Sequence, residues 1–144
     1  MEVTKKMLES YRSNRQEIKE LEYILKNRWK SDTMISVDTI LNYSKVYPVP
    51  EGVDGFDHEK YERLQHRDMK RKELLEQECE AVEKFVDNIR ESRTRRIFQL
   101  YFLNGETKPT QSNVARKVHM ERSNISKKID AYIKLSQKSQ KSHV

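Results

Sequence analysis

Three side chains near the C-terminal end of the sequence have the chemistry needed to recognise DNA bases. They are Arg122, Asn124 and Lys127, in the segment ERSNISKKI. Asn pairs bidentately with adenine in the major groove and Arg or Lys with guanine, and each good pair contributes about 1 to 3 kcal/mol of discrimination. We therefore treat these three residues as candidate base-reading residues.

A second set of side chains in the same region suits the DNA backbone. Hydroxyl, amide and cationic groups bond phosphate oxygens and fix the register of a protein on a duplex without reading its sequence. The amide groups at the start of a helix also favour anions. The candidate phosphate-binding residues are Gln111, Ser112, Arg116, Lys117, Ser123 and Lys128.

These candidates fall on two short segments with helical periodicity. Thr110 is a good N-cap for the first segment, and Met120 is an apolar residue in the break of about three residues that separates the two. The spacing of three to four residues predicts that each segment packs one face against a shared core. The apolar residues concerned are Val114, Ala115 and Val118, then Ile125, Ile129 and Tyr132.

Two helical segments separated in this way are typical of a helix-turn-helix. At about 100° per residue, the second helix turns donors and cations away from its apolar side. That polar face holds Ser123, Asn124, Lys127 and Lys134. We expect it to enter the major groove of double-stranded DNA, although two short amphipathic helices that merely complete a bundle remain the alternative.

The connection between the segments departs from the commonest pattern at two positions. His119 stands where Gly is most frequent, and Glu121 stands at the N-cap of the second helix, where Ser, Thr or Asp is preferred. His tolerates a positive φ better than most residues, so the turn is strained but feasible. A shifted register with Ser123 as the cap stays open.

The distribution of charge favours a polyanionic partner. Residues 90–144 contain 13 Lys and Arg against 4 Asp and Glu, whereas residues 1–89 contain 16 against 19. Binding to DNA strengthens with each phosphate that a cation neutralises. We expect the last ten residues, LSQKSQKSHV, to be a disordered basic tail because they have no apolar periodicity.

Composition excludes several classes of protein. The 144 residues include one Cys, three Gly and three Pro, and 36% are charged, which predicts a small protein rich in helix. No apolar run approaches the roughly 18 residues that span a bilayer, and the N-terminus has no apolar signal segment. A lone Cys79 fits a reducing cytosol, so we expect a cytoplasmic location and no membrane partner.

No residue pattern predicts an enzyme, a cofactor or a metal site. The four histidines are too scattered for the paired spacing of metal ligands, and one Cys cannot supply a thiolate cluster. Cys79 occupies an apolar heptad position, so we interpret it as a core residue and not a nucleophile. The chain has no Gly-rich phosphate loop.

The rest of the chain predicts an all-α fold. Residues 2–29 and 58–89 read as long helices with heptad-like apolar spacing, which we expect to fold back on each other as a coiled coil. The first carries Leu8, Tyr11, Ile18, Leu21 and Leu25, widened by Ile24 and Trp29; the second carries Tyr61, Leu64, Leu75, Cys79, Val82, Val86 and Ile89.

A polar run within the second long helix and a shorter third helix also bear on the predicted fold. The polar run HRDMKRKE, residues 66–73, interrupts the second helix and is either a weak point or an exposed face. A third helix over residues 92–103 should support the two short helices through apolar side chains, and Asn104 and Gly105 should end it. These supporting residues are Ile97, Leu100, Tyr101 and Leu103.

The expected organisation is thus a long helical hairpin followed by a three-helix unit. Residues 1–89 form the coiled-coil hairpin with a loop at 30–57, residues 90–134 form the helix-turn-helix DNA-binding domain, and residues 135–144 form the tail. Exposed heptads usually need further partners, so our hypothesis is a homodimer.

The segments RTRRIFQLYFLNG and TQSNVARKVHMERSNISKKI resemble phage-encoded late transcription regulators of the RinA and ArpU type, whose C-terminal part is similar to region 4 of sigma factors. The resemblance covers about residues 89–133. The matching positions are Tyr101, Gly105, Val114, Ala115, Ile125 and Ile129. It implies a phage or prophage regulator that binds DNA upstream of a promoter and contacts RNA polymerase.

Two other classes of protein remain open. A DNA-packaging or assembly protein, such as a small terminase subunit, would build a ring from its coiled-coil helices and hold DNA non-specifically. A coiled-coil interaction adaptor would not bind DNA at all.

Overall fold

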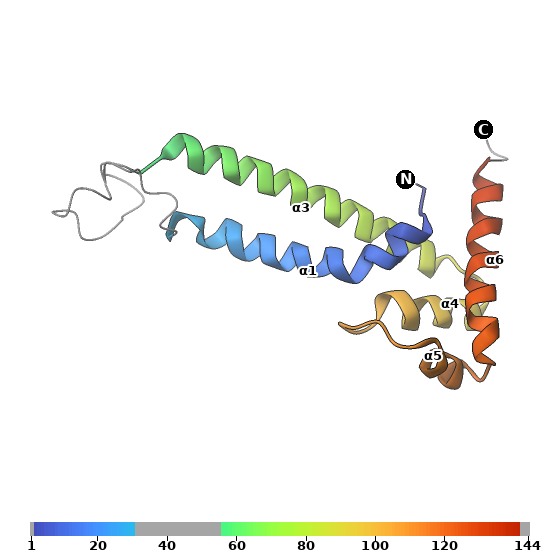
Figure 1. Cartoon of the computed structure of the whole chain (residues 1–144). Coiled ribbons are helices and arrows are strands. Elements are labelled where there is room, and N and C mark those ends of the chain that lie inside the picture. Colours follow the sequence, from blue (N-terminus) through green and yellow to red (C-terminus); the bar gives the residue numbers. More distant parts are fainter. Residues whose placement is uncertain (1, 31–55, 142–144) are drawn as a thin grey trace. The chain divides into compact units, whose positions relative to one another are not determined.

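The computed structural model describes residues 2–30 and 56–141, and every regular element in these ranges is a helix (Figure 1). The all-α class is therefore confirmed. Residues 31–55 of the loop expected over 30–57 lie outside the described residues. The elements are α1 (Lys5–Asn27), the 3-10 turn η1 (Arg28–Lys30), α3 (His58–Asp87), α4 (Ser92–Phe98), the π-helical turn η3 (Gln99–Leu103), α5 (Gln111–Val118) and α6 (Arg122–Lys141).

The chain divides into two compact units, and both long helices contribute to each. One unit contains Met1–Arg15 and Glu76–Val144, and the other contains Gln16–Leu75. The boundary expected at residue 89 does not coincide with this division. The reason is that the start of α1 and the end of α3 share a hydrophobic core with the C-terminal helices.

The Gln16–Leu75 unit pairs the second half of α1 with the first half of α3 around a mixed apolar and ionic interior. Ile18 and Leu21 are buried, as the heptad spacing predicted. Arg28 and Asp68 are also buried and form an ion pair, and Arg28 Nη1 donates to Gln65 Oε1 at 2.7 Å. Apolar and ionic contacts together therefore hold these two helical segments.

Two predictions for this unit were wrong. The polar run over residues 66–73 contains Asp68, whose burial beside Arg28 makes this part of α3 neither a gap nor a wholly exposed face. Ile24 and Trp29, expected to widen the apolar stripe of α1, are exposed instead. Arg28 occupies the interior position because its charge is neutralised there.

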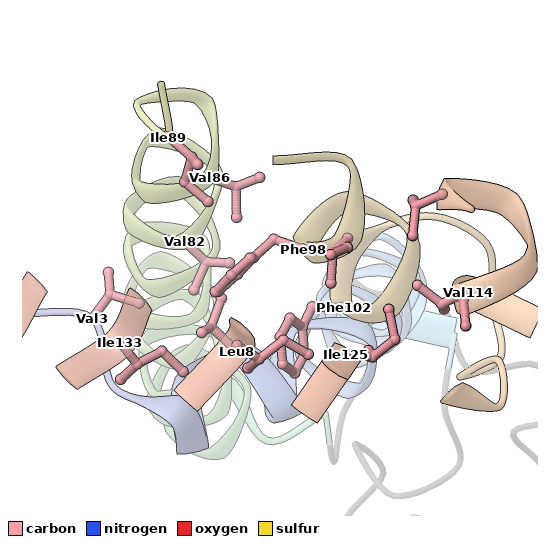
Figure 2. Packing of buried hydrophobic residues seen from close by; sticks show 14 residues of the cluster. Val3, Leu8, Val82, Val86, Ile89, Phe98, Phe102, Val114, Ile125 and Ile133 are labelled. Carbon is pink, nitrogen blue, oxygen red and sulfur yellow. The ribbon is translucent and has the colours of Figure 1, made fainter. Parts of the chain in front are cut away.

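The core of the other unit contains residues of α1, α3, α4, α5 and α6 and of the π-helical turn η3 (Figure 2). In this view, Leu8 of α1 and Val82 and Val86 of α3 lie around the same interior as Phe98 and Phe102. The ring centroids of Phe98 and Phe102 are 5.6 Å apart. Val114, Ile125 and Ile133 of α5 and α6 complete the cluster.

The third helix of the sequence analysis has a different buried face from the one expected. Ile97 is buried as predicted, but Leu100, Tyr101 and Leu103 are only half-buried, and Phe98 and Phe102 fill the core instead. The buried residues Thr94, Ile97, Phe98 and Phe102 stand at i, i+3, i+4 and i+8, so they share one face of a regular helical repeat, and this face packs in the core. A π-helical turn ends the segment and is closed by a 2.7 Å hydrogen bond from Asn104 N to Gln99 O.

Arg12 of α1 binds the C-terminal end of this π-helical turn. Its guanidinium lies against backbone carbonyls that have no partner within a helix, and such groups otherwise need a cap or water. Burial lowers the pKa of Arg12. The accepting oxygens are those of Leu100 (3.2 Å), Tyr101 (2.7 Å), Asn104 (2.7 Å) and Gly105 (3.3 Å).

The tail expected to be disordered is largely helical. α6 continues to Lys141, so only residues 142–144 of the expected 135–144 segment lie outside the described residues. Each residue added to an existing helix gains one hydrogen bond, and Leu, Gln and Lys are good helix formers. Leu135 is 65% exposed, which shows that this extension depends little on burial of its apolar side chain.

None of the helices in residues 2–30 and 56–141 combines the length and apolar character required to span a membrane.

Candidate nucleic-acid interface

The start of α5 is capped as the sequence predicted. Thr110 has an extended backbone, and its hydroxyl oxygen accepts a 3.2 Å hydrogen bond from the amide of Asn113. A Thr cap satisfies one of the amides that a helix leaves unpaired at its first turn. The remaining amides at this end are free of intrahelical partners and can bond an anion.

His119 makes the turn between α5 and α6. Its φ of 58° and ψ of 51° place it in the left-handed region, where Gly is the commonest residue. The amide of Met120 then donates to the Ala115 carbonyl at 2.9 Å, and the Met120 side chain packs against the core. His119 therefore adopts the left-handed conformation that Gly most often adopts at this position.

The register of α6 follows from its first hydrogen bond. The helix begins at Arg122, and the amide of Asn124 donates to the Glu121 carbonyl at 3.0 Å. Glu121, and not Ser123, therefore precedes the first helical residue. This register fixes which side chains of α6 share a face.

The inner faces of α5 and α6 are apolar, and the two helices contact each other through them. Val114, Ala115 and Val118 are buried, as are Ile125 and Ile129. Tyr132 is half-buried, and its ring lies 5.5 Å from Phe98 and 5.6 Å from Phe85. Core packing thus sets the rotation of α6 about its axis.

All three candidate base-reading residues are exposed. Asn124 and Lys127 lie on the side of α6 opposite Ile125 and Ile129, and Arg122 is the first helical residue. Their side chains are open to solvent, so a duplex could reach them. This exposure is the structural condition that base contact requires.

The candidate phosphate-binding residues differ in how far their side chains are exposed. Ser112, Arg116, Lys117 and Ser123 are exposed, while Gln111 is half-buried. The guanidinium of Arg116 donates to the Asn113 side chain at 3.2 Å, which holds it along α5. These residues offer hydroxyl groups and cations at the surface of α5 and at the start of α6.

Lys128 differs from the other candidates because an intramolecular partner holds it. Its Nζ donates a 2.6 Å hydrogen bond to Oε1 of Glu91, the residue immediately before α4. Hydrogen bonds from Lys128 and Thr94 lower the pKa of Glu91. A phosphate would have to compete with this carboxylate, so Lys128 is less available than the sequence indicated.

Asp130 occupies the opposite flank of α6 and also has a partner. Lys5 of α1 donates to Asp130 Oδ1 at 2.9 Å, and this hydrogen bond raises the pKa of Lys5. Asp130 is the sole acidic residue between 122 and 141 in the sequence. The ion pair neutralises a charge that would otherwise repel phosphate, and no feature of the sequence indicated it.

Arg96 adds a cation that was not among the residues predicted from the sequence. Its guanidinium donates to the Lys117 carbonyl at 3.5 Å, at the C-terminal end of α5. Both side chains are exposed. The arginine run RTRR was the available signal, but its spacing alone did not show which arginine would approach α5.

The described part of the chain contains no group of three or more His, Cys, Asp or Glu side chains arranged to hold a metal ion. Cys79 is buried, and burial raises the pKa of its thiol to about 11. A thiol with that pKa is almost entirely protonated at neutral pH.

No protein-family model, curated protein or solved structure matches this chain.

Proposed function

We propose that this chain is a sequence-specific DNA-binding protein in which α5 and α6 act as a helix-turn-helix. The observation that carries the proposal is the orientation of α6. Its apolar residues Ile125 and Ile129 are sealed in the core, while Asn124 and Lys127 are exposed on the other side. A helix with this division of faces can enter the major groove with its donors toward the base edges.

The proposed base contacts follow from side-chain chemistry. Asn124 pairs with adenine through its amide, and Lys127 donates to the acceptors of guanine. Arg122 joins them from the first turn of α6. This trio supplies the sequence discrimination.

The proposed backbone contacts come mainly from α5. Its first turn offers free amides, and Arg116 and Lys117 are exposed cations near its end. Gln111 and Ser112 bond phosphate oxygens beside the amides, and Ser123 does so from α6. Lys128 joins them only when it leaves Glu91.

The biological role within the proposal is regulation of transcription. We also propose that a coiled-coil hairpin precedes the helix-turn-helix in the chain. The proposed location is the cytoplasm, where DNA is accessible. The resemblance to phage late regulators is the sole support for a phage or prophage origin and for contact with RNA polymerase.

Selection from random duplex DNA tests the central claim. We expect the full chain to enrich one motif, and Asn124→Ala or Lys127→Ala to reduce discrimination against mismatched sites by about 1 to 3 kcal/mol. Arg116→Ala and Lys117→Ala should instead weaken binding to all sequences and reduce its salt dependence. Equal losses on specific and random DNA for all four variants would contradict the assigned faces.

The assembly state separates the proposal from its alternatives. We expect a dimer by sedimentation equilibrium, since paired recognition helices read repeated half-sites. A large ring in light scattering would favour a packaging protein. Absence of DNA binding at low salt would favour an adaptor.

A further inference from the structure

The outward face of α6 is narrower than its sequence indicates, because ion pairs occupy both flanks. Lys128 is drawn to Glu91 at 2.6 Å on one side, and Asp130 is bonded to Lys5 at 2.9 Å on the other. Between these two ion pairs lies a strip of the α6 surface whose side chains are not buried in the core and do not take part in either ion pair.

This strip contains one small apolar side chain among polar ones. At about 100° per residue, Asn124, Lys127, Ala131 and Lys134 share the side opposite Ile129. All four are exposed, whereas Ile125, Ile129 and Ile133 are buried. Ala131 therefore presents its methyl group to solvent between two lysines.

The spacing of the strip matches the geometry of groove reading. In a homeodomain, the residues of the recognition helix that face the major groove stand at i, i+3, i+4 and i+7. Counted from Asn124, those positions are Lys127, Lys128 and Ala131. Since Lys128 is held by Glu91, Ala131 is the remaining position of this set.

We infer that Ala131 is a specificity-determining residue that contacts the 5-methyl group of a thymine in the major groove. This inference rests on the proposed DNA-binding function. A short side chain lets the helix backbone approach the groove floor, and an Ala methyl group recognises the thymine methyl by apolar contact. Lys127 and Lys134 flank the contact, where Lys127 bonds a neighbouring base and Lys134 favours a nearby phosphate.

A double-mutant cycle between protein and DNA tests this contact. Each thymine of the selected motif is replaced by uracil, which removes only the 5-methyl group, and the wild type is compared with Ala131→Gly on both duplexes. We expect one position at which uracil weakens wild-type binding about fourfold, the factor given by burial of about one methyl group. The same replacement should change binding of Ala131→Gly by less than about 1.5-fold, because the partner methyl group is gone.

Two controls make the result specific. Leu135→Gly weakens the same helix at an exposed position and should keep the fourfold sensitivity to uracil. A 5-methylcytosine–guanine pair at the sensitive position supplies the same methyl group from another base. The wild type should bind this pair more tightly than the unmethylated cytosine–guanine pair, and equal binding of the two would contradict the methyl contact.

The outcomes separate this inference from the function on which it rests. Enrichment of a motif with no uracil-sensitive thymine, or with equal sensitivity in wild type and Ala131→Gly, overturns the role of Ala131 alone. Failure of the wild type to enrich any motif overturns the proposed function. Circular dichroism of both variants at the binding temperature verifies that the compared proteins are folded.

Discussion

Arg12 donates a 2.7 Å hydrogen bond to the carbonyl oxygen of Tyr101, from the first half of α1 to the π-helical turn that follows α4. The same guanidinium also reaches the carbonyls of Asn104 and Gly105, where the chain leaves that turn. One side chain therefore satisfies several backbone acceptors at a helix end. The helices that carry the candidate interface depend on a residue about 90 positions earlier in the sequence.

Substitution of Arg12 should destabilise the unit that contains α4, α5 and α6. We expect Arg12→Gln to lower the free energy of unfolding by about 2 kcal/mol, since hydrogen bonds from a charged donor are lost. Urea denaturation followed by circular dichroism measures the change. Arg15→Gln, an exposed position on the same helix, is the matched control and should change stability by less than about 0.5 kcal/mol. Equal stability of the two variants would contradict this role.

A charge at Ile125 should unfold the same unit. Ile125 is fully buried, and an unpaired carboxylate there has neither water nor a partner. We expect Ile125→Asp to lose more than about 4 kcal/mol and its cooperative thermal transition. Ser123→Asp adds the same charge at an exposed site in the first turn of α6, where an acid is favourable, and should melt like the wild type. A wild-type melting curve for Ile125→Asp would refute the packing of α6.

Removal of the Glu91 carboxylate should strengthen DNA binding. Glu91→Gln frees Lys128 from its 2.6 Å ion pair, so an additional cation can neutralise a phosphate. We expect tighter binding to all sequences, and the slope of log K against log salt should become more negative by about 1. Titration of a labelled duplex at several salt concentrations measures both. Glu106→Gln makes the same change of charge at an exposed residue and should leave the slope unchanged.

The Arg28–Asp68 ion pair should make stability depend on acid pH. Burial raises the pKa of Asp68, but hydrogen bonds from Arg67 and Arg28 and their charges outweigh it, so the pKa lies below its usual value. A carboxylate with a depressed pKa contributes stability above its unfolded pKa of about 3.9, and this contribution is lost as pH falls through the folded pKa.

Asp68→Asn measures that contribution. At pH 7 the variant should be less stable by about 3 to 5 kcal/mol, because it leaves Arg28 buried without its counterion. Below about pH 4 the difference should shrink, since the wild-type carboxyl group becomes protonated as well. Urea denaturation at pH 7, 5 and 3 tests this, with the exposed Glu62→Gln as control. A difference independent of pH would exclude Asp68 as the titrating group.

Local signals in the sequence were sufficient for much of the secondary structure. Thr110 as a cap, the apolar spacing of α5 and α6, and the tolerance of His119 for a positive φ all depend on nearby residues, and all three are observed. The error over residues 135–141 has a local cause too. A helix can continue without an apolar stripe once it is nucleated.

The apolar and ionic interiors were predicted less well. The segment from Ile97 to Leu103 is apolar at nearly every position, so the helical repeat alone does not show that the face with Phe98 and Phe102 packs in the core. Arg28 and Asp68 are 40 residues apart, and neither residue type by itself predicts burial. Only when α3 lies beside α1 does each charge find its counterion.

The sequence by itself determined the helical class, the position of the turn at His119 and the chemistry of the exposed side of α6, because periodicity and residue type act over a few neighbouring residues. The tertiary structure decided which of those side chains stay available. Lys128 is engaged by Glu91, just before α4, and Asp130 is engaged by Lys5, at the start of α1. Partners 37 and 125 residues away in the chain are set by the packing of whole helices, which no local pattern specifies.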